Sequence, residues 1–143
     1  MTEPSFLGAS GGRLIHPWRG SADALVDAAI GHAPVWWLRG SRMRSRQGLM
    51  DEWAAATQFP PHFGGTWDAL RDALSDLPEG GTFLVLEADQ LLQEAAPGEA
   101  ETLLAVLRDV EGELKPKPFR LVFQAEPDRH ETLLEGLRAL GAL

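Results

Sequence analysis

Three aspartates spaced four residues apart, Asp68, Asp72 and Asp76, are the residues best placed to carry chemistry in this sequence. They fall in a segment whose apolar residues recur with helical spacing, which places the three carboxylates along one exposed ridge. Like charges four residues apart destabilise a helix by about 0.2–0.5 kcal/mol per pair. A cationic partner would offset that repulsion, so the ridge predicts a binding surface for a basic molecule.

The same carboxylates permit two other interpretations. Asp68 and Asp72 have the side chains of a general acid–base pair, but the sequence identifies no pocket that would hold a substrate beside them. An acidic helix face that contacts only water is the simpler interpretation when these residues are taken alone. The interpretation as a binding surface therefore depends on the loop that precedes the helix.

Motifs for other chemistries are weak in this chain. The segment 8–12 matches the G-x-S-x-G pattern of serine hydrolases around Ser10, but that motif needs a preceding strand and only seven residues come before it. A flexible terminus is the better interpretation, and a small hydrolase using Ser10 or the aspartates ranks last. The four histidines lack metal-ligand spacing and the chain has no cysteine, so we expect no metal site and no cofactor.

Length and composition favour one intracellular globular domain. The chain has 143 residues, 44% of them hydrophobic, with five tryptophans and no cysteine. We expect residues 1–11 to form a flexible leader and residues 12–143 to form a single domain. The N-terminus lacks the features of a signal peptide, and no apolar run approaches the ~20 residues of a membrane-spanning helix. These features predict a cytoplasmic protein that contacts no membrane.

The negative charge is concentrated in the middle of the chain. The formal net charge is −8, but residues 68–113 hold 12 acidic and two basic side chains, a balance of −10. This distribution argues against nucleic acid as the direct ligand and favours a basic partner. The main basic cluster is the loop that contains Arg39, Arg42, Arg44 and Arg46. It is interpreted either as a solvated loop or as a contact for an anion, namely the chain's own acidic ridge or a partner's carboxylates.

Alternating helix and strand patterns predict the framework that positions the acidic ridge. We expect strands at 13–18, 35–38, 82–87 and 119–124, and helices at 22–30, 66–77, 98–110 and 127–140. A further helix contains Leu49, Met50, Trp53 and Ala54 and ends near Thr57. Because helices separate the strands, an α/β fold with parallel pairing follows. The sheet has three strands, or four if 13–18 joins as an edge strand that ends at Pro17. The side chains of Trp36, Trp37, Trp53 and Trp67 are expected to be buried.

The loop and helix around the aspartates carry a further signal. From Leu38 to Leu77 the chain runs through Gly40, Phe59-Pro60 and His62-Phe63-Gly64 to Trp67-Asp-Ala-Leu70 and Asp72. This ungapped pattern resembles the barstar family, intracellular inhibitors of the ribonuclease barnase. The later strands at 83–87 and 119–124 resemble that family as well. The resemblance covers about residues 35–125, so residues 1–34 and 126–143 are additions to it.

This resemblance implies a barstar-like layered fold and a function in inhibition. Members of that family insert an acidic helix and its preceding loop into the RNA-binding active site of a basic ribonuclease. By resemblance, Asp72 takes the place of an RNA phosphate, Asp68 meets a neighbouring cation, and Asp109 makes a charged contact from the following helix. The implied rim of the interface consists of His62, Phe63, Gly64 and Thr66.

Three positions depart from the family pattern. Thr66 replaces an asparagine, Arg71 replaces a tryptophan, and His62-Phe63 replaces a pair of tyrosines. Since Arg71 places a cation inside the acidic helix, we expect the partner to be a ribonuclease other than barnase that offers Arg71 a carboxylate. The sequence thus predicts a non-enzymatic inhibitor or immunity protein, monomeric alone. The alternative is a barstar-fold binding module for a basic protein that is not a nuclease.

Overall fold

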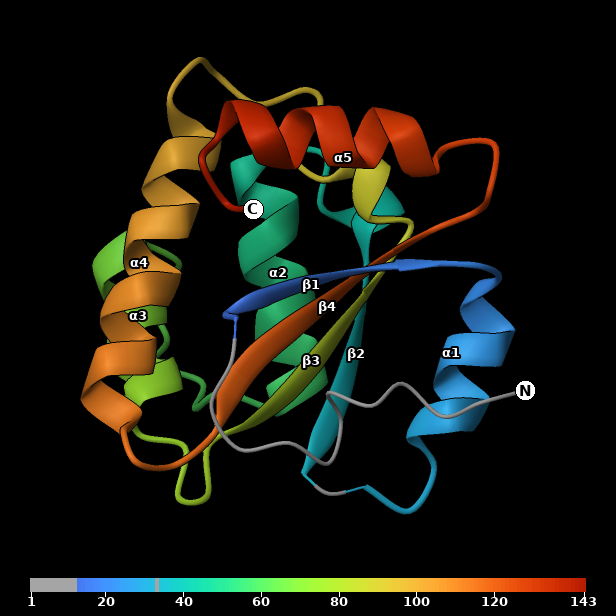
Figure 1. The fold of residues 1–143 in the computed structure, drawn as a ribbon. Coiled ribbons are helices and arrows are strands. Elements are labelled where there is room, and N and C mark those ends of the chain that lie inside the picture. Colours follow the sequence, from blue (N-terminus) through green and yellow to red (C-terminus); the bar gives the residue numbers. More distant parts are fainter. Residues whose placement is uncertain (1–12, 33) are drawn as a thin grey trace.

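A computed structural model describes residues 13–32 and 34–143 of the chain (Figure 1). The predicted leader and the G-x-S-x-G pattern lie outside these residues. Two 3-10 turns, η2 (Gly40–Arg42) and η3 (Ala88–Gln90), follow β2 and β3. The strands and helices are, in chain order, β1 (Ile15–Arg19), α1 (Ala22–Ala29), β2 (Val35–Arg39), α2 (Arg46–Thr57), α3 (Trp67–Ser75), β3 (Gly81–Leu86), α4 (Glu99–Leu114), β4 (Phe119–Ala125) and α5 (His130–Ala139).

The four strands form one parallel sheet in the order β1-β4-β3-β2. The predicted α/β class and parallel pairing are therefore confirmed, and β1 takes the predicted edge position. Pro17 was expected to end this strand but lies within it, opposite Phe123. An edge strand tolerates proline because the missing N–H can face the side that has no neighbouring strand.

The sheet separates two hydrophobic clusters, because successive strand residues point to opposite faces. The larger cluster joins Phe83 and Phe123 to buried residues of α2, α3, α4 and α5. The smaller cluster joins Leu84 and Val122 to α1. Figure 1 shows α1 on one side of the sheet and α3 and α4 on the other. The aspartate-bearing helix α3 is thus fixed to the sheet through the larger cluster.

The prediction that four tryptophans are buried is only partly correct. Trp53 is buried, whereas Trp36 and Trp67 are half-buried and Trp37 is 49% exposed. Trp37 lies on the edge strand β2, and the short helix α1 packs over the central strands without covering it. The ring of Trp37 instead lies 5.5 Å from the guanidinium carbon of Arg39, a cation–π contact at the surface.

Two helix boundaries differ from the prediction by three residues or more. Helix α4 continues past the expected end at Val110 to Leu114, and both residues are buried, so apolar packing sustains the extra turn. Helix α5 begins at His130 because the preceding residues form a turn, in which the Arg129 N–H donates to the Glu126 carbonyl at 2.8 Å.

Candidate functional site

The loop before α3 is fixed by a turn and an aromatic contact. The backbone N–H of Phe63 donates to the Pro60 carbonyl at 2.9 Å, and the ring centroids of Phe59 and Phe63 lie 4.9 Å apart. Phe63 is half-buried against the larger cluster, whereas His62 and Gly64 are exposed. The loop therefore presents an exposed imidazole and exposed backbone beside a ring that is held in place.

Helix α3 begins with a side-chain cap. Gly65 has a φ of +68°, a left-handed conformation that glycine adopts without a Cβ clash. The hydroxyl of Thr66 then accepts a hydrogen bond from the Ala69 N–H at 3.1 Å. Leu70 and Leu74 are fully buried, as the apolar stripe predicts. The cap and the stripe together fix which side of α3 faces the solvent.

A polar contact also ties the start of α3 to its neighbours. The indole N–H of Trp67 donates to Glu99 at 2.9 Å, and Arg46 lies 3.8 Å from the other oxygen of the same carboxylate. Glu99 is the first residue of α4 and Arg46 is the first residue of α2. Three helix starts are therefore joined at one carboxylate, which orients α3 relative to α4.

Arg71 lies at the centre of three carboxylates on this surface. Its guanidinium is 3.5 Å from Asp68, 3.9 Å from Asp72 and 3.9 Å from Asp109. The three aspartates, here called the carboxylate cluster, have side chains that are 84%, 77% and 61% exposed, respectively. Two of these residues come from α3 and one from α4, which pack side by side (Figure 1). The cluster with Arg71 carries a formal charge of −2 at neutral pH.

Asp76 does not join the carboxylate cluster. It is exposed and follows α3, where its N–H bonds to the Ala73 carbonyl at 3.3 Å. Its carboxylate has no hydrogen bond or ion pair within the described part of the chain. The ridge expected from the spacing is therefore divided, with Asp68 and Asp72 in the cluster and Asp76 outside it.

A hollow of about 530 Å³ lies between α3 and α4 beside the carboxylate cluster. The buried hydroxyl oxygen of Ser75 has no hydrogen-bond partner among the described residues. No role was assigned from the sequence to Ser75, Arg108 or Glu113. Ser75 follows Arg71 by four positions on α3, and Glu113 follows Asp109 by four positions on α4, so spacing could have indicated these two. The hollow, here called the α3–α4 hollow, is lined by Arg71, Asp72, Ser75, Arg108, Asp109, Gly112 and Glu113.

The arginine-rich loop contacts carboxylates of its own chain. Arg44 pairs with Glu94 at 3.3 Å and Arg46 with Glu99 at 3.8 Å. These two arginines therefore contact anions of the chain, but the carboxylates are those of Glu94 and Glu99 and not those of the expected acidic ridge. Both glutamates belong to the acidic middle segment but not to the carboxylate cluster, so the loop leaves the cluster free for a partner.

Residues 13–32 and 34–143 contain neither a candidate metal site nor a candidate membrane span. No group of three or more histidine, aspartate or glutamate side chains there is arranged to hold a metal ion. No helix in the same ranges is long and apolar enough to cross a membrane.

Comparison with known proteins agrees with this architecture. Residues 33–124 match the family model of barstar, the barnase inhibitor. The matched segment includes β2, β3, all but the last residue of β4, and the helices that carry the carboxylate cluster. A search of curated proteins finds no match to the chain. Because the family model covers more than half of the sequence, this chain belongs to the barstar (barnase inhibitor) family.

Proposed function

We propose that this protein inhibits a basic ribonuclease by placing α3 and the loop before it in the enzyme's RNA-binding site. The observation that carries the proposal is the carboxylate cluster, in which Asp68, Asp72 and Asp109 are exposed around one guanidinium. Membership of an inhibitor family supports the same conclusion. As part of this proposal the protein acts in the cytoplasm, where it protects cellular RNA.

Each residue of the proposed interface has a distinct task. Asp72 occupies the place of an RNA phosphate, because a carboxylate offers two oxygens to arginine and lysine donors in charge-assisted hydrogen bonds. Asp68 and Asp109 contact further cations of the nuclease. The loop supplies the rim, where exposed groups meet the region that a base would occupy: the residues are His62, Phe63, Gly64 and Thr66.

Thr66 contributes to the proposed interface mainly through its backbone. Its hydroxyl is already used to cap α3, at 3.1 Å from the Ala69 nitrogen. Thr66 stands where the family pattern has an asparagine, and it uses its side chain to cap α3. Side-chain contacts at the rim therefore come mainly from His62 and from the ring of Phe63.

Arg71 is the specificity-determining residue in this proposal. Its guanidinium pairs with the three carboxylates that the nuclease must bind. The nuclease therefore either displaces the guanidinium with several cations of its own, or pairs the guanidinium with one of its own carboxylates. The second arrangement is the one we propose, because it leaves no cation facing the positive surface of a nuclease. A nuclease with an entirely basic site is then a poor partner.

The test begins with the full chain immobilised and used to capture partners from a lysate of its source. Captured protein is assayed for RNA cleavage, and the free chain is added back to measure inhibition. Asp72→Asn removes one charge from the cluster with little change in shape, and Asp76→Asn is its matched control. Loss of charge-assisted bonds of about 1.5–3 kcal/mol weakens inhibition about 10- to 150-fold for the first variant. Asp76→Asn should change the strength of inhibition by less than about twofold, because a single exposed charge contributes little.

Two results would oppose this proposal. One is equal inhibition by the wild type and by both variants, which would move the interface away from the carboxylate cluster. The other is an association rate that does not fall with salt, although exposed charges are screened over about 8–10 Å at ordinary ionic strength.

A second candidate function is a binding module for a basic protein that is not a nuclease. The neutralising contacts of Arg71 favour it, since they depart from the family pattern at the centre of the site. Under this function the captured partner depends on Asp72 but cleaves no RNA. The same capture experiment therefore separates the two candidates.

A further inference from the structure

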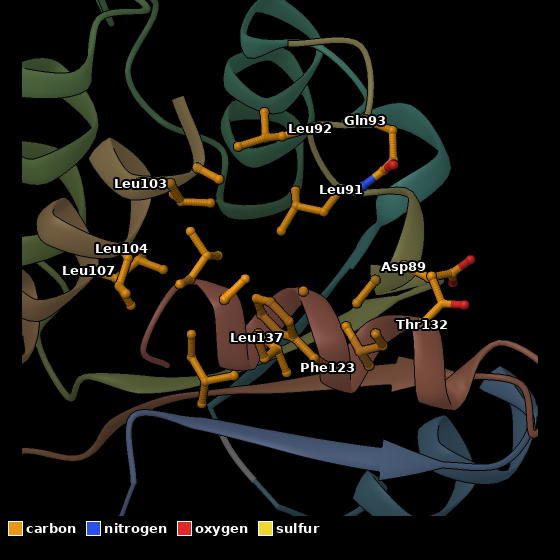
Figure 2. Close-up of a pocket in the computed structure, with 17 residues that line it drawn as sticks. Asp89, Leu91, Leu92, Gln93, Leu103, Leu104, Leu107, Phe123, Thr132 and Leu137 are labelled. Carbon is orange, nitrogen blue, oxygen red and sulfur yellow. The ribbon is translucent and has the colours of Figure 1, made fainter. Parts of the chain in front are cut away.

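An apolar cavity lies on the other side of α4 from the carboxylate cluster. Its volume is about 290 Å³, and α4, α5, β4 and the segment after η3 form its walls. Figure 2 shows side chains from these elements converging on the space between the helices. Six of the seventeen lining residues are large buried apolar side chains of α4, β4 and α5: Leu103, Leu104, Leu107, Phe123, Leu133 and Leu137.

The size and lining of this cavity suit an apolar molecule better than water. A water molecule in a cavity needs two to four polar partners, which these side chains do not offer. An apolar cavity of about 150 Å³ is large enough for benzene. A cavity of about 290 Å³ therefore has room for roughly ten to twelve carbon atoms.

The backbone conformation of one wall residue points in the same direction. Leu92 has a φ of +57°, a left-handed conformation that a leucine rarely adopts. Its N–H donates to the Met43 carbonyl at 2.8 Å, and the Glu94 N–H donates to the Arg44 carbonyl at 2.8 Å. These two bonds hold the segment against the loop before α2 and keep Leu92 in the cavity wall. Strained residues are concentrated at ligand sites, so the strain is a second indication of binding.

Polar groups are confined to the place where the lining reaches the surface. Gln93 and Thr132 are exposed, and their side chains have no hydrogen-bond partner among the described residues. Beside them the side chain of Asp89 is only 8% exposed and accepts from Arg129 at 3.1 Å, which neutralises its charge. An uncharged head group can bond to the free amide and hydroxyl there. A charged head would disturb the Asp89–Arg129 pair.

We propose that this cavity binds a single alkyl chain of about ten carbons that carries an uncharged, hydrogen-bonding head such as a primary alcohol. The chain lies among the leucines of α4 and α5, and the head bonds to Gln93 or Thr132 at the surface. The wall formed by α5 lies outside the family match at residues 33–124, whereas the walls formed by α4, β4 and the segment after η3 lie within it.

The probe is 1-decanol, compared with 1-hexanol, decanoate and decylammonium by calorimetry and thermal unfolding of the full chain. At tenfold excess over its Kd, 1-decanol should raise the melting temperature by about 3–6 °C. Hexanol lacks four methylene groups and should bind about 100- to 300-fold more weakly. Decanoate and decylammonium should each bind at least about tenfold more weakly than 1-decanol, because both carry a net charge to a neutral mouth.

Two alanines on α4 provide a matched pair of variants. Ala100 lines the cavity, whereas Ala105 is exposed and lines none of the described cavities. Ala100→Leu fills part of the space and should abolish 1-decanol binding, and Ala105→Leu should leave it unchanged. Gly136→Leu narrows the cavity from α5, where a Cβ meets no atom within 4 Å, and gives an independent second test.

Three results would overturn the proposal. The first is no binding of 1-decanol by the wild-type chain. The second is undiminished binding by both Ala100→Leu and Gly136→Leu, which would place the alcohol elsewhere. The third is equal binding of all three ten-carbon probes, which would show that the mouth does not select an uncharged head.

Discussion

Replacing Arg71 by glutamine tests whether the carboxylate cluster is held together by charge. Arg71→Gln removes the guanidinium from among Asp68, Asp72 and Asp109 and changes the local formal charge from −2 to −3. The three carboxylates are mostly exposed, so each pair contributes only about 0.2–0.5 kcal/mol to folding. The repulsion between Asp68 and Asp72, about 0.2–0.5 kcal/mol, is also no longer offset. The expected loss of folding stability is therefore about 1–2 kcal/mol.

The assay is urea unfolding followed by tryptophan fluorescence, at low salt and in about 1 M NaCl, where the Debye length is about 3 Å. Screening by salt weakens both the ion pairs and the repulsion between the aspartates. The difference in the free energy of unfolding between Arg71→Gln and the wild type should therefore shrink by more than half at high salt. Arg108→Gln is the matched control. Arg108 is an exposed arginine on α4 that donates to the Gly141 carbonyl at 3.0 Å, and no carboxylate of the described residues lies within ion-pair distance of it.

Arg108→Gln should therefore show a stability change that does not depend on salt. The reasoning would be refuted by an Arg71→Gln loss that is the same at both salt concentrations. It would also be refuted by a loss above about 3 kcal/mol, since exposed ion pairs are too weak to account for one. A rise in stability would show that the three carboxylates do not repel one another as their spacing implies.

Further predictions concern the elements around the site. Thr66→Ala should lower the free energy of unfolding by about 1 kcal/mol, because the α3 cap is lost. Thr66→Ser keeps the capping hydroxyl and should leave the free energy of unfolding nearly unchanged, and thermal unfolding compares the two variants. Gly40→Ala should prevent a stable fold, because a Cβ at this position overlaps the Glu87 carbonyl. Gly64→Ala should fold normally, because a Cβ there makes only an ordinary contact with Ala69. Circular dichroism and the yield of soluble protein distinguish the two variants. Burial lowers the pKa of His16 from its ordinary value of 6.5, so protonation favours the unfolded chain. Stability should therefore fall as the pH drops below about 6.5, and His16→Gln should reduce that fall in a series of urea titrations.

Local features of the site were accessible from the sequence. Helix α3 and its buried Leu70 and Leu74 depend on residues three or four positions apart, and spacing alone predicts them. The cap formed by Thr66 was not predicted, because Thr66 was considered only as a residue of the rim. The parallel pairing of the strands followed from their alternation with helices. The resemblance named Asp109, but spacing could not place it beside Arg71, because that contact requires α4 to pack against α3.

Features that depend on the order of strands or on packing between distant segments were missed. Trp37 was expected to be buried because it lies in an apolar run, yet β2 is an edge strand, and strand order cannot be read from a single run. The unpaired hydroxyl of Ser75 depends on the fit between α3 and α4. The apolar cavity depends on how α5 lies over α4, and residues 126–143 offered no family pattern from which to infer it.

The position of β1 in the sheet has a consequence for how the chain folds. Ile15 of β1 lies opposite Leu121 of β4. Because β4 is synthesised last of the four strands, β1 has no partner strand until β4 has been made. Strands β2, β3 and β4 can pair with one another first, since they lie within the family-matched segment. Closing so long a loop is slow, and an unpaired strand is prone to aggregation. We therefore expect β1 to be the last strand to join the sheet, since its backbone can pair only after β4 has been synthesised.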